Sequence, residues 1–203
     1  MACAAIMAAV GPAYGSDNRV KIVALGDSLT AGLGLKTEAT FPARLEQALI
    51  ARGMAVEVIN AGVSGDTTSG GLARLDWAVP DGTDAVILAL GANDMLRGID
   101  PKITREALTG IIQRLSDRHI AVLLAGMRAA RNMGADYAGA FDAIFPELAS
   151  RFDLVFYPFF LDGVAGERSL NQPDGIHPTE AGVQVIVARM LPTVEKLVTR
   201  IRQ

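Results

Sequence analysis

Short apolar runs recur along most of the chain and are separated by longer stretches of mixed character. Most of the runs are apolar at every position, which is typical of strands buried on both faces of a parallel sheet. The five runs are Val20–Leu25, Ala55–Asn60, Ala85–Leu90, Ile120–Ala125 and Leu154–Tyr157. The pattern therefore predicts five strands that are covered on both sides.

The stretches between and after these runs carry apolar residues at the three- and four-residue spacing of helices. In one of them, Leu108, Ile111 and Leu115 lie on a single apolar stripe. The predicted helices are Pro42–Arg52, Ser69–Ala78, Ile103–Arg118, Ala135–Arg151 and Thr179–Ile201. Alternating strands and helices with right-handed crossovers predict one three-layer α/β/α domain. We expect a flavodoxin-like, five-stranded parallel sheet.

The first fifteen residues, Met1–Gly15, differ from the rest of the chain. Ala2–Val10 is apolar, Pro12 would break a helix, and small residues follow at the spacing of a cleavage site. This arrangement resembles a secretory signal peptide, although the usual basic start is missing. We therefore expect a truncated signal peptide over residues 1–15, one folded domain over residues 16–203, and a periplasmic or secreted protein. A disordered apolar tail is the alternative.

The charge of the chain is low and evenly spread. Of its 203 residues 20% are charged, the formal net charge is −3, and the Lys and Arg residues are scattered. This distribution gives no electrostatic footprint for nucleic acid or for an anionic membrane. After the leader, no segment approaches the roughly 18 unbroken apolar residues of a membrane span. We expect no nucleic-acid partner, no stable membrane insertion, and a monomer or a small homo-oligomer.

Residue types that ligate metals are scarce. Cys3 is the only cysteine and lies in the apolar leader, and the two histidines, His119 and His177, are far apart in the sequence. A histidine-rich zinc site is therefore not indicated, and no metal or cofactor is predicted. His119 directly precedes an apolar run, so we expect it at the surface or at a helix end.

Four polar clusters that contain glycine follow the predicted strands. Three of them come directly after the first three strands, and the fourth lies between the fifth strand and the last helix. The clusters are Gly26-Asp27-Ser28-Leu29-Thr30, Ala61-Gly62-Val63-Ser64-Gly65-Asp66, Gly91-Ala92-Asn93-Asp94 and Asp174-Gly175-Ile176-His177-Pro178. Ligands of open parallel sheets bind outside the carboxyl ends of the strands. We therefore predict that the four clusters converge on one crevice.

Ser28 is the candidate nucleophile of this crevice. Serine needs a base, and His177 lies three residues after Asp174, so a turn can bring the carboxylate against one imidazole nitrogen. Each part also has a simpler explanation, because Ser28 can cap a helix and Asp174 can belong to a β-turn. A phosphate-binding loop is not indicated, because no Lys-Ser or Lys-Thr pair completes that motif.

Three N–H donors are candidates for an oxyanion hole. They are the backbone N–H of Ser28, the backbone N–H of Gly65 and the side-chain amide of Asn93. Preorganised donors of this kind stabilise a tetrahedral intermediate. Taken alone, Gly65 and Asn93 can equally belong to an ordinary turn or loop. The combination predicts a serine esterase in which Ser28, Asp174 and His177 are catalytic.

At these residues the sequence resembles the SGNH (GDSL-type) hydrolase superfamily. The motif blocks of that superfamily appear in order as Gly26-Asp27-Ser28-Leu29, Gly65 within Ser64-Gly65-Asp66-Thr67, Gly91-Ala92-Asn93-Asp94 and Asp174-Gly175-Ile176-His177. The resemblance implies a flavodoxin-like sheet over residues 16–203, the catalytic and oxyanion roles named above, and no cofactor or metal.

Within the superfamily, the chain looks most similar to the bacterial periplasmic thioesterase I/lysophospholipase group and to the arylesterases near it. The similar features are Ser64–Asp76, Asn93–Gly98 and Tyr157-Pro158-Phe159-Phe160. That group is exported, in agreement with the leader. The resemblance implies hydrolysis of acyl esters or thioesters through an acyl-enzyme on Ser28.

The candidate substrate-binding residues lie next to the motif blocks. Phe159 and Phe160, with Leu161, are expected to wall an apolar channel for an acyl chain, although ordinary core packing is the alternative. Met95 and Leu96, with Arg97, are expected to form the rim of the same pocket, and Leu29 is expected beside the nucleophile. The substrate-binding residues are thus predicted to be Leu29, Met95, Leu96, Phe159 and Phe160.

Other functions are compatible with the same fold. A carbohydrate acetylesterase is one, although the chain carries no attached sugar-binding domain. A non-catalytic, flavodoxin-like binding module is another, but it leaves the Asp174–His177 pair and Asn93 unexplained. A purely structural or partner-binding role predicts nothing about these residues.

Overall fold

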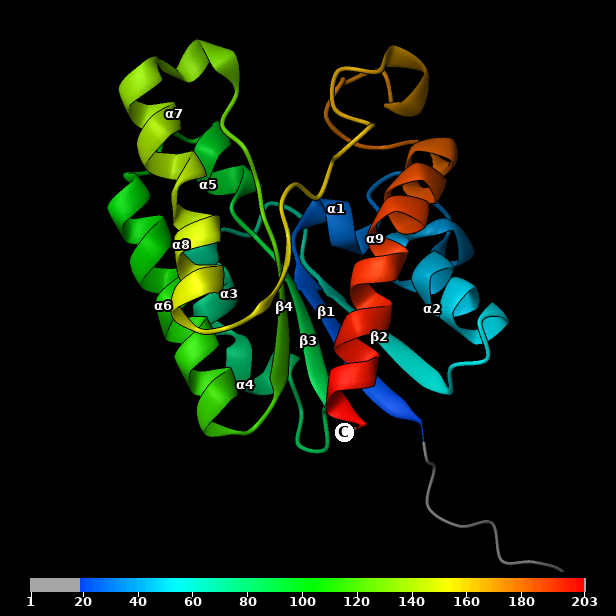
Figure 1. Ribbon diagram of the computed structural model, residues 1–203. Helices are drawn as coiled ribbons and strands as arrows, with labels where there is room; N and C mark the ends of the chain where they lie inside the picture. Colours follow the sequence, from blue (N-terminus) through cyan, green and yellow to red (C-terminus); the bar gives the residue numbers. More distant parts are fainter. Residues whose placement is uncertain (1–18, 203) are drawn as a thin grey trace, which may run out of the picture.

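A five-stranded parallel sheet runs through the middle of the structure, a computed structural model that describes residues 19–202 (Figure 1). The strand order is β2-β1-β3-β4-β5, the flavodoxin-like order. The strands are β1 Val20–Gly26, β2 Val56–Gly62, β3 Ala85–Ala89, β4 Ala121–Ala125 and β5 Val155–Tyr157. The predicted fold class is therefore confirmed. The predicted signal peptide lies outside the described residues.

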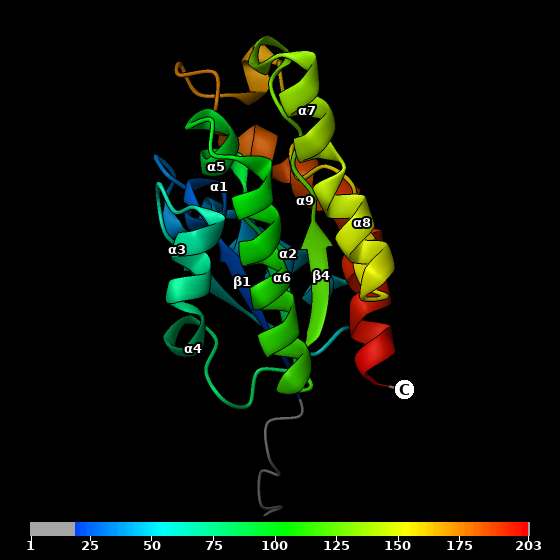
Figure 2. The ribbon, with the colours of Figure 1, turned by 90° about the vertical axis from the view of Figure 1, so that its left-hand side faces the viewer.

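Helices cover both faces of the sheet (Figures 1 and 2). The helices α2 and α9 pack together on one face, and α3, α6 and α8 lie on the other. The helices are α1 Ser28–Ala31, α2 Phe41–Ala51, α3 Thr68–Ala73, α4 Leu75–Ala78, α5 Ala92–Leu96, α6 Pro101–Asp117, α7 Ala135–Asp142, α8 Ile144–Arg151 and α9 Glu180–Ile201. Short 3₁₀ turns occur at η1 Thr37–Ala39, η2 Arg131–Met133 and η3 Arg168–Leu170.

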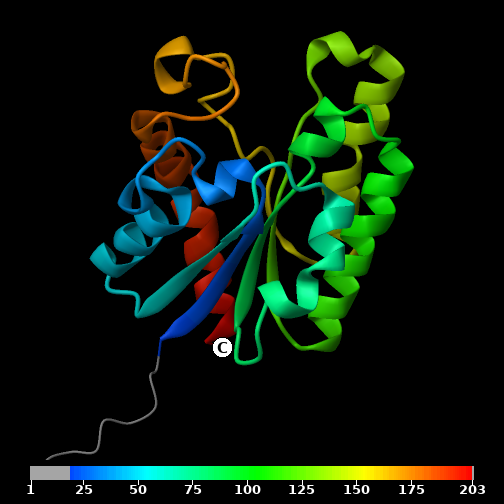
Figure 3. The ribbon, with the colours of Figure 1, turned by 180° about the vertical axis from the view of Figure 1, so that it is seen from behind.

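The two edges of the sheet differ in what they carry. In Figure 3 the start of β1 and the end of α9 lie at the amino edge of the strands. The short helices α1 and α5 follow β1 and β3 directly, so they lie at the opposite, carboxyl edge. This edge is where the fold places the loops that can build a site.

Two of the predicted helices are each divided in two. The stretch 69–78 forms parts of α3 and α4, which meet at Arg74, where ψ is 6°. The stretch 135–151 forms α7 and α8, which meet at Ala143. Pro146 has no N–H to donate to the carbonyl of Asp142, so the helical hydrogen-bond ladder is interrupted there. Neither interruption changes the predicted layers.

Phe160 belongs to the hydrophobic core, so its expected place in the wall of an acyl channel is wrong. Its ring is fully buried and packs edge to face on Phe41, with centroids 5.0 Å apart. Phe160 lies in the turn that follows β5, and its N–H donates to Gly126 O at 2.8 Å. Phe159, by contrast, lines a cavity at the carboxyl edge of the sheet.

Candidate active site

The loops at the carboxyl edge of the sheet enclose a cavity of about 380 Å³. Ser28, Asn93 and His177 all line this cavity, although they come from three separate clusters of the sequence. The predicted convergence is therefore observed for these three residues. Gly65 is not among the lining residues, but its loop contacts Asn93 through the next residue, because Asn93 Nδ2 donates to Asp66 O at 2.9 Å.

Ser28 is the first residue of α1, and only Asp27 separates it from the end of β1. Asp27 caps the helix, because its Oδ1 accepts the N–H of Leu29 at 2.9 Å. The end of β2 lies directly against α1: a Cβ on Gly62 would come within 2.2 Å of Ala31 N. Cap and close approach together fix the turn that presents the Ser28 hydroxyl to the cavity.

The hydroxyl, the imidazole and a carboxylate form one hydrogen-bonded series. Ser28 Oγ lies 2.9 Å from His177 Nε2, and His177 Nδ1 lies 2.6 Å from Asp174 Oδ2. An ionised carboxylate can only accept hydrogen bonds, so Nδ1 carries the proton of the neutral ring. This leaves Nε2 free to accept the Ser28 O–H.

Asp174 is held in its ionised form by the turn in which it lies. Its Oδ1 accepts the backbone N–H groups of Ile176 and His177, at 2.9 and 3.0 Å. These two bonds, together with the bond from the His177 ring, lower the pKa of Asp174 from 3.8 to about 2. The side chain is therefore a carboxylate at neutral pH.

The loop that carries His177 is anchored by Gln172, a residue that the sequence analysis did not single out. Gln172 N–H donates to His177 O at 2.7 Å, and its Nε2 donates to Pro178 O at 3.0 Å and to Leu33 O at 2.7 Å. Leu33 follows α1, the helix that begins with Ser28. Gln172 thus joins the segment that carries the His177 imidazole to the segment that follows the Ser28 helix.

The oxyanion candidates have distinct environments. Gly65 has φ +82°, a backbone conformation that favours glycine, and Arg97 Nη2 donates to its carbonyl at 2.6 Å. Asn93 Nδ2 donates to Asp66 O and also to Asp27 Oδ2, the second at a longer 3.3 Å. The Asn93 amide is therefore already oriented, with its weaker bond made to a carboxylate beside Ser28.

Two fully buried carboxylates stand behind these groups. Burial raises the pKa of Asp27 from 3.8 to about 6, although the Leu29 N–H and nearby His177 favour the ionised form. Asp94 accepts from Thr68 Oγ1 at 2.5 Å, Thr68 N at 2.9 Å and Thr104 Oγ1 at 3.1 Å. Asp94 thereby ties α5, which contains Asn93, to the start of α3 and to α6.

The cavity is mainly apolar and opens beside Ser28. Leu29, Met95, Leu96 and Phe159 line it, as the sequence suggests, whereas the buried Phe160 does not. Ala92, Gly175 and Ile176, from the motif blocks, also line it, as does Leu161, which was expected beside Phe159. No feature of the sequence indicates the remaining lining residues, which are Met127, Arg128, Ala129, Ala130, Arg131, Ala165, Gly166 and Asn171. Those residues lie outside the long helices and the strands, so no regular spacing in the sequence predicts which way their side chains point.

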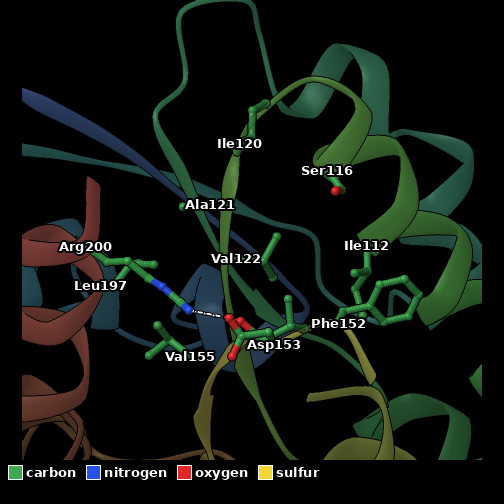
Figure 4. A pocket seen from close by; sticks show the side chains of 11 residues that line it. Ile112, Ser116, Ile120, Ala121, Val122, Phe152, Asp153, Val155, Leu197 and Arg200 are labelled. Carbon is green, nitrogen blue, oxygen red and sulfur yellow. Dashed lines mark hydrogen bonds and ion pairs between the residues drawn. The ribbon is translucent and has the colours of Figure 1, made fainter. Parts of the chain in front are cut away.

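A second cavity, of about 210 Å³, lies at the amino edge of β4 and β5 (Figure 4). Figure 4 shows the Arg200 guanidinium directed at Asp153, with the apolar side chains of Ile112, Val122 and Phe152 around them. The two charged groups neutralise one another, and no nucleophile–base pair lies there. This cavity has none of the chemistry found at the carboxyl edge.

The other histidine lies away from this cavity. His119 is exposed at the end of α6, as expected, so His177 is the histidine of the cavity. Within residues 19–202 no group of three or more His, Cys, Asp and Glu residues is arranged to hold a metal ion. Over the same residues no helix combines the length and apolar character needed to cross a membrane.

Comparison with known proteins gives the same picture. The model of the GDSL-like lipase/acylhydrolase family matches residues 24–185. An arylesterase of Vibrio mimicus is 40% identical over 159 residues, 78% of this chain and 80% of that protein. The thioesterase 1/protease 1/lysophospholipase L1 of Escherichia coli K12 is 36% identical over 178 residues, 87% and 84% of the two chains. The crystal structure of AlinE4, an SGNH-hydrolase family esterase, is 45% identical with a TM-score of 0.75, covering 88% of this chain and 96% of that one.

The fold and the carboxyl-edge site together define a three-layer α/β/α hydrolase that cleaves ester bonds. The chain belongs to the GDSL-like lipase/acylhydrolase family, within the SGNH hydrolases. The resemblance drawn from the four motif blocks is confirmed, including the similarity to arylesterases and to the thioesterase I/lysophospholipase group. The chain is accordingly an ester-bond hydrolase of the group that includes arylesterases, thioesterases and lysophospholipases.

The raised pKa of Asp27 makes stability depend on pH. Between about pH 4 and pH 6 the folded protein retains a proton that the unfolded chain has lost, so its free energy of unfolding falls as pH rises through this range. The loss is at most about 3 kcal/mol. Asp27→Ser keeps an oxygen for the Leu29 N–H and removes the titrating group. We expect its urea unfolding free energy to decline less than that of the wild type between pH 4 and pH 7.

The exposed Asp174 acts in the opposite direction and in a different pH window. Its contribution to the free energy of unfolding is present above about pH 4 and is lost as pH falls toward 2.

The prediction for Asp27 would be contradicted if the free energies of unfolding of the wild type and of Asp27→Ser changed in parallel from pH 4 to pH 7.

Proposed function

We propose that Ser28, His177 and Asp174 carry out ester and thioester hydrolysis through an acyl-enzyme on Ser28. The observation that carries the proposal is the hydrogen-bonded series of Ser28 Oγ, His177 and Asp174, with distances of 2.9 and 2.6 Å. Geometry of this kind lets one group attack while the next takes its proton. The ionised Asp174 stabilises the imidazolium that forms.

The reaction runs in two stages. In the first, Ser28 Oγ bonds to the substrate carbonyl carbon as His177 Nε2 takes the hydroxyl proton. The tetrahedral intermediate then expels the alcohol or thiol, which receives that proton from the imidazolium. In the second, a water molecule gives a proton to Nε2 and attacks the acyl carbon, and Ser28 Oγ leaves with the proton from His177.

The negative charge on the intermediate is stabilised by the backbone N–H groups of Ser28 and Gly65 and by the Asn93 amide. Asn93 Nδ2 keeps its 2.9 Å bond to Asp66 O, and its second N–H exchanges the longer contact with Asp27 for the oxyanion. Donors held in place before reaction need no reorganisation as the charge develops.

The apolar cavity beside Ser28 supports an acyl chain as the group on the carbonyl carbon. Leu29, Met95, Leu96 and Phe159 are proposed to contact it. Burying methylene groups against such side chains contributes about 0.8 kcal/mol each. An apolar lining favours acyl esters over an acetylated sugar, whose hydroxyl groups would lose hydrogen bonds to water there.

We expect Ser28→Ala and His177→Ala to lower kcat by about 10⁴ or more while the fold persists. The first removes the proposed nucleophile, and the second removes the group that takes its proton. Asn93→Ala removes one donor and should cost about 10²–10³. The measurement is hydrolysis of p-nitrophenyl esters with acyl groups of two to twelve carbons, alongside an acyl-CoA and an acetylated sugar.

Labelling tests the nucleophile separately from turnover. An organophosphonate should modify the wild type at Ser28 and leave Ser28→Ala unmodified. Modification at another residue, or full activity of Ser28→Ala, would show that Ser28 is not the nucleophile. Circular dichroism spectra identical to the wild type serve as the folding control.

Phe159→Ala should shift the preference among acyl-chain lengths, because Phe159 lines the cavity and its ring is also stacked under the Arg128 guanidinium, 5.2 Å from the ring centroid. The readout is kcat/KM across the p-nitrophenyl ester series. Phe152→Ala is the matched control: Phe152 is also half-buried but lines the cavity at the other edge of the sheet. An unchanged profile for Phe159→Ala would remove Phe159 from the acyl site.

The composition of residues 1–15 further supports export, and we propose a periplasmic or secreted protein that acts as a monomer or a small homo-oligomer. Fractionation of bacteria that express the full chain tests the location. Activity confined to the cytoplasm, with the first fifteen residues still attached, would contradict export. Sedimentation of the purified protein gives the oligomeric state.

A further inference from the structure

A buried arginine lies beneath the site and contacts neither the cavity nor the catalytic series. Arg74 stands at the junction of α3 and α4, and only 9% of its side chain is exposed. Its Nε donates to Asp66 Oδ2 at 2.6 Å, and its Nη2 donates to Gly26 O at 2.9 Å. The mechanism above gives this residue no task.

The two partners of Arg74 belong to the two segments that supply the backbone oxyanion donors. Gly26 ends β1, two residues before Ser28, and Asp66 directly follows Gly65. One planar guanidinium therefore connects the segment just before Ser28 to the residue just after Gly65. Its N–H groups point in fixed directions in one plane, so the guanidinium sets the positions of Gly26 O and Asp66 Oδ2 relative to each other. The small, freely rotating ammonium of a lysine cannot do this.

The same contact extends to the third donor. Asp66 gives its side chain to Arg74 and its backbone carbonyl to Asn93 Nδ2, at 2.9 Å. Moving Asp66 would therefore move Gly65 and release Asn93 together. We propose that Arg74 is a positioning residue that sets the three oxyanion donors relative to one another, a role that rests on the proposed function of Ser28, Gly65 and Asn93.

The loop between β2 and α3 is held near its α3 end by the bond between Arg74 and Asp66. At its start, Val63 N–H donates to Gly26 O at 3.1 Å, and within it Asp66 N–H donates to Val63 O at 3.1 Å. Gly26 O thus accepts from both Val63 and Arg74. Without the guanidinium the loop keeps its bond at Val63 and the bonds that Arg97 and Asn93 make to its carbonyl groups, but the Asp66 carboxylate, next to Gly65, loses its partner.

Gly70 leaves the space that this arrangement needs. A Cβ on Gly70 would lie 1.9 Å from Asp66 Oδ1, so any larger residue would displace the carboxylate. Gly70 precedes Arg74 by four residues, one helical turn along α3, and both therefore face Asp66. The helix provides both the cation and the room for its partner.

A buried ion pair is a poor source of net stability, because the cost of removing both charges from water offsets their attraction. A purely structural account of Arg74 predicts a loss of stability on substitution with kcat unchanged. The positioning account predicts a loss of kcat, because an error of about 1 Å in a reacting group can cost on the order of 10² in rate. The two accounts are therefore separable.

The first test is Arg74→Lys, which keeps the charge and removes the planar guanidinium. We expect kcat for p-nitrophenyl esters to fall by about 10- to 100-fold, with KM changed by no more than about twofold, because the lost interactions act only in the transition state. The rate of phosphonate labelling at Ser28 should fall by a similar factor.

Arg118→Lys is the matched control. Arg118 Nη2 also donates to a backbone carbonyl, Val79 O at 2.7 Å, and to a carboxylate, Asp81 Oδ1 at 3.4 Å. It lies at the end of α6, next to β4 at the amino edge of the sheet. Replacing the Arg118 guanidinium by the lysine ammonium should leave kcat and KM unaltered.

The second test is a double-mutant cycle with Asn93→Ala. Substitutions that act through the same donors are not additive, whereas independent losses of structure are. In the Asn93→Ala background we expect Arg74→Lys to lower kcat by a factor at least about three times smaller than in the wild type. Equal factors in the two backgrounds would overturn the proposal.

Gly70→Ala keeps the proposal testable should Arg74→Lys fold poorly. It retains Arg74 and displaces Asp66, so kcat should again fall with KM little changed. Gly139→Ala is its control, since a Cβ on this α7 glycine meets no atom within 4 Å. Wild-type kcat in a folded Arg74→Lys or Gly70→Ala variant refutes the positioning role. A wild type that resists labelling at Ser28 refutes the proposed function instead.

Discussion

The hydrogen bond between Ser28 Oγ and His177 Nε2 is the contact on which the site depends, and it joins residues 149 positions apart. A parallel sheet makes such a contact reproducible, because every strand delivers its following loop to the same edge. The helices on both faces fix the sheet, and Gln172 then ties the segment of His177 to the chain that follows α1. The distance between hydroxyl and imidazole is thus a product of the whole fold.

The strands and the polar clusters could be predicted from the sequence because each has a local signal. The strands β3 and β4 are apolar throughout, Ser28 and Asn93 follow apolar runs within a few residues, and His177 stands just before the last helical stretch. The interruption at Ala143 was harder to predict. Pro146 lies within the first turn of α8, where a proline is tolerated, so its effect on the preceding residues is visible only in the folded chain.

The direction of a side chain outside regular structure has no such signal. Phe159 and Phe160 are the same residue type at adjacent positions, yet one lines the cavity and the other packs on Phe41. The backbone there is held by a distant segment, because Phe160 N–H donates to Gly126 O just after β4. The bonds of Asp66 to Arg74 and Asn93 are likewise set by tertiary placement, and no spacing in the sequence encodes them.

The loop that bears His177 also supplies part of the cavity wall, through Gly175 and Ile176. If this cavity holds the acyl chain as proposed, redesign of that side would also alter the segment that holds the His177 imidazole. The opposite wall, built by Met95, Leu96 and residues 127–131, carries no member of the catalytic series. Within that wall, residues 127–131 lie on a segment separate from Ser28, Asn93 and His177, so substitutions there would reshape the cavity without altering the groups proposed to act on the substrate.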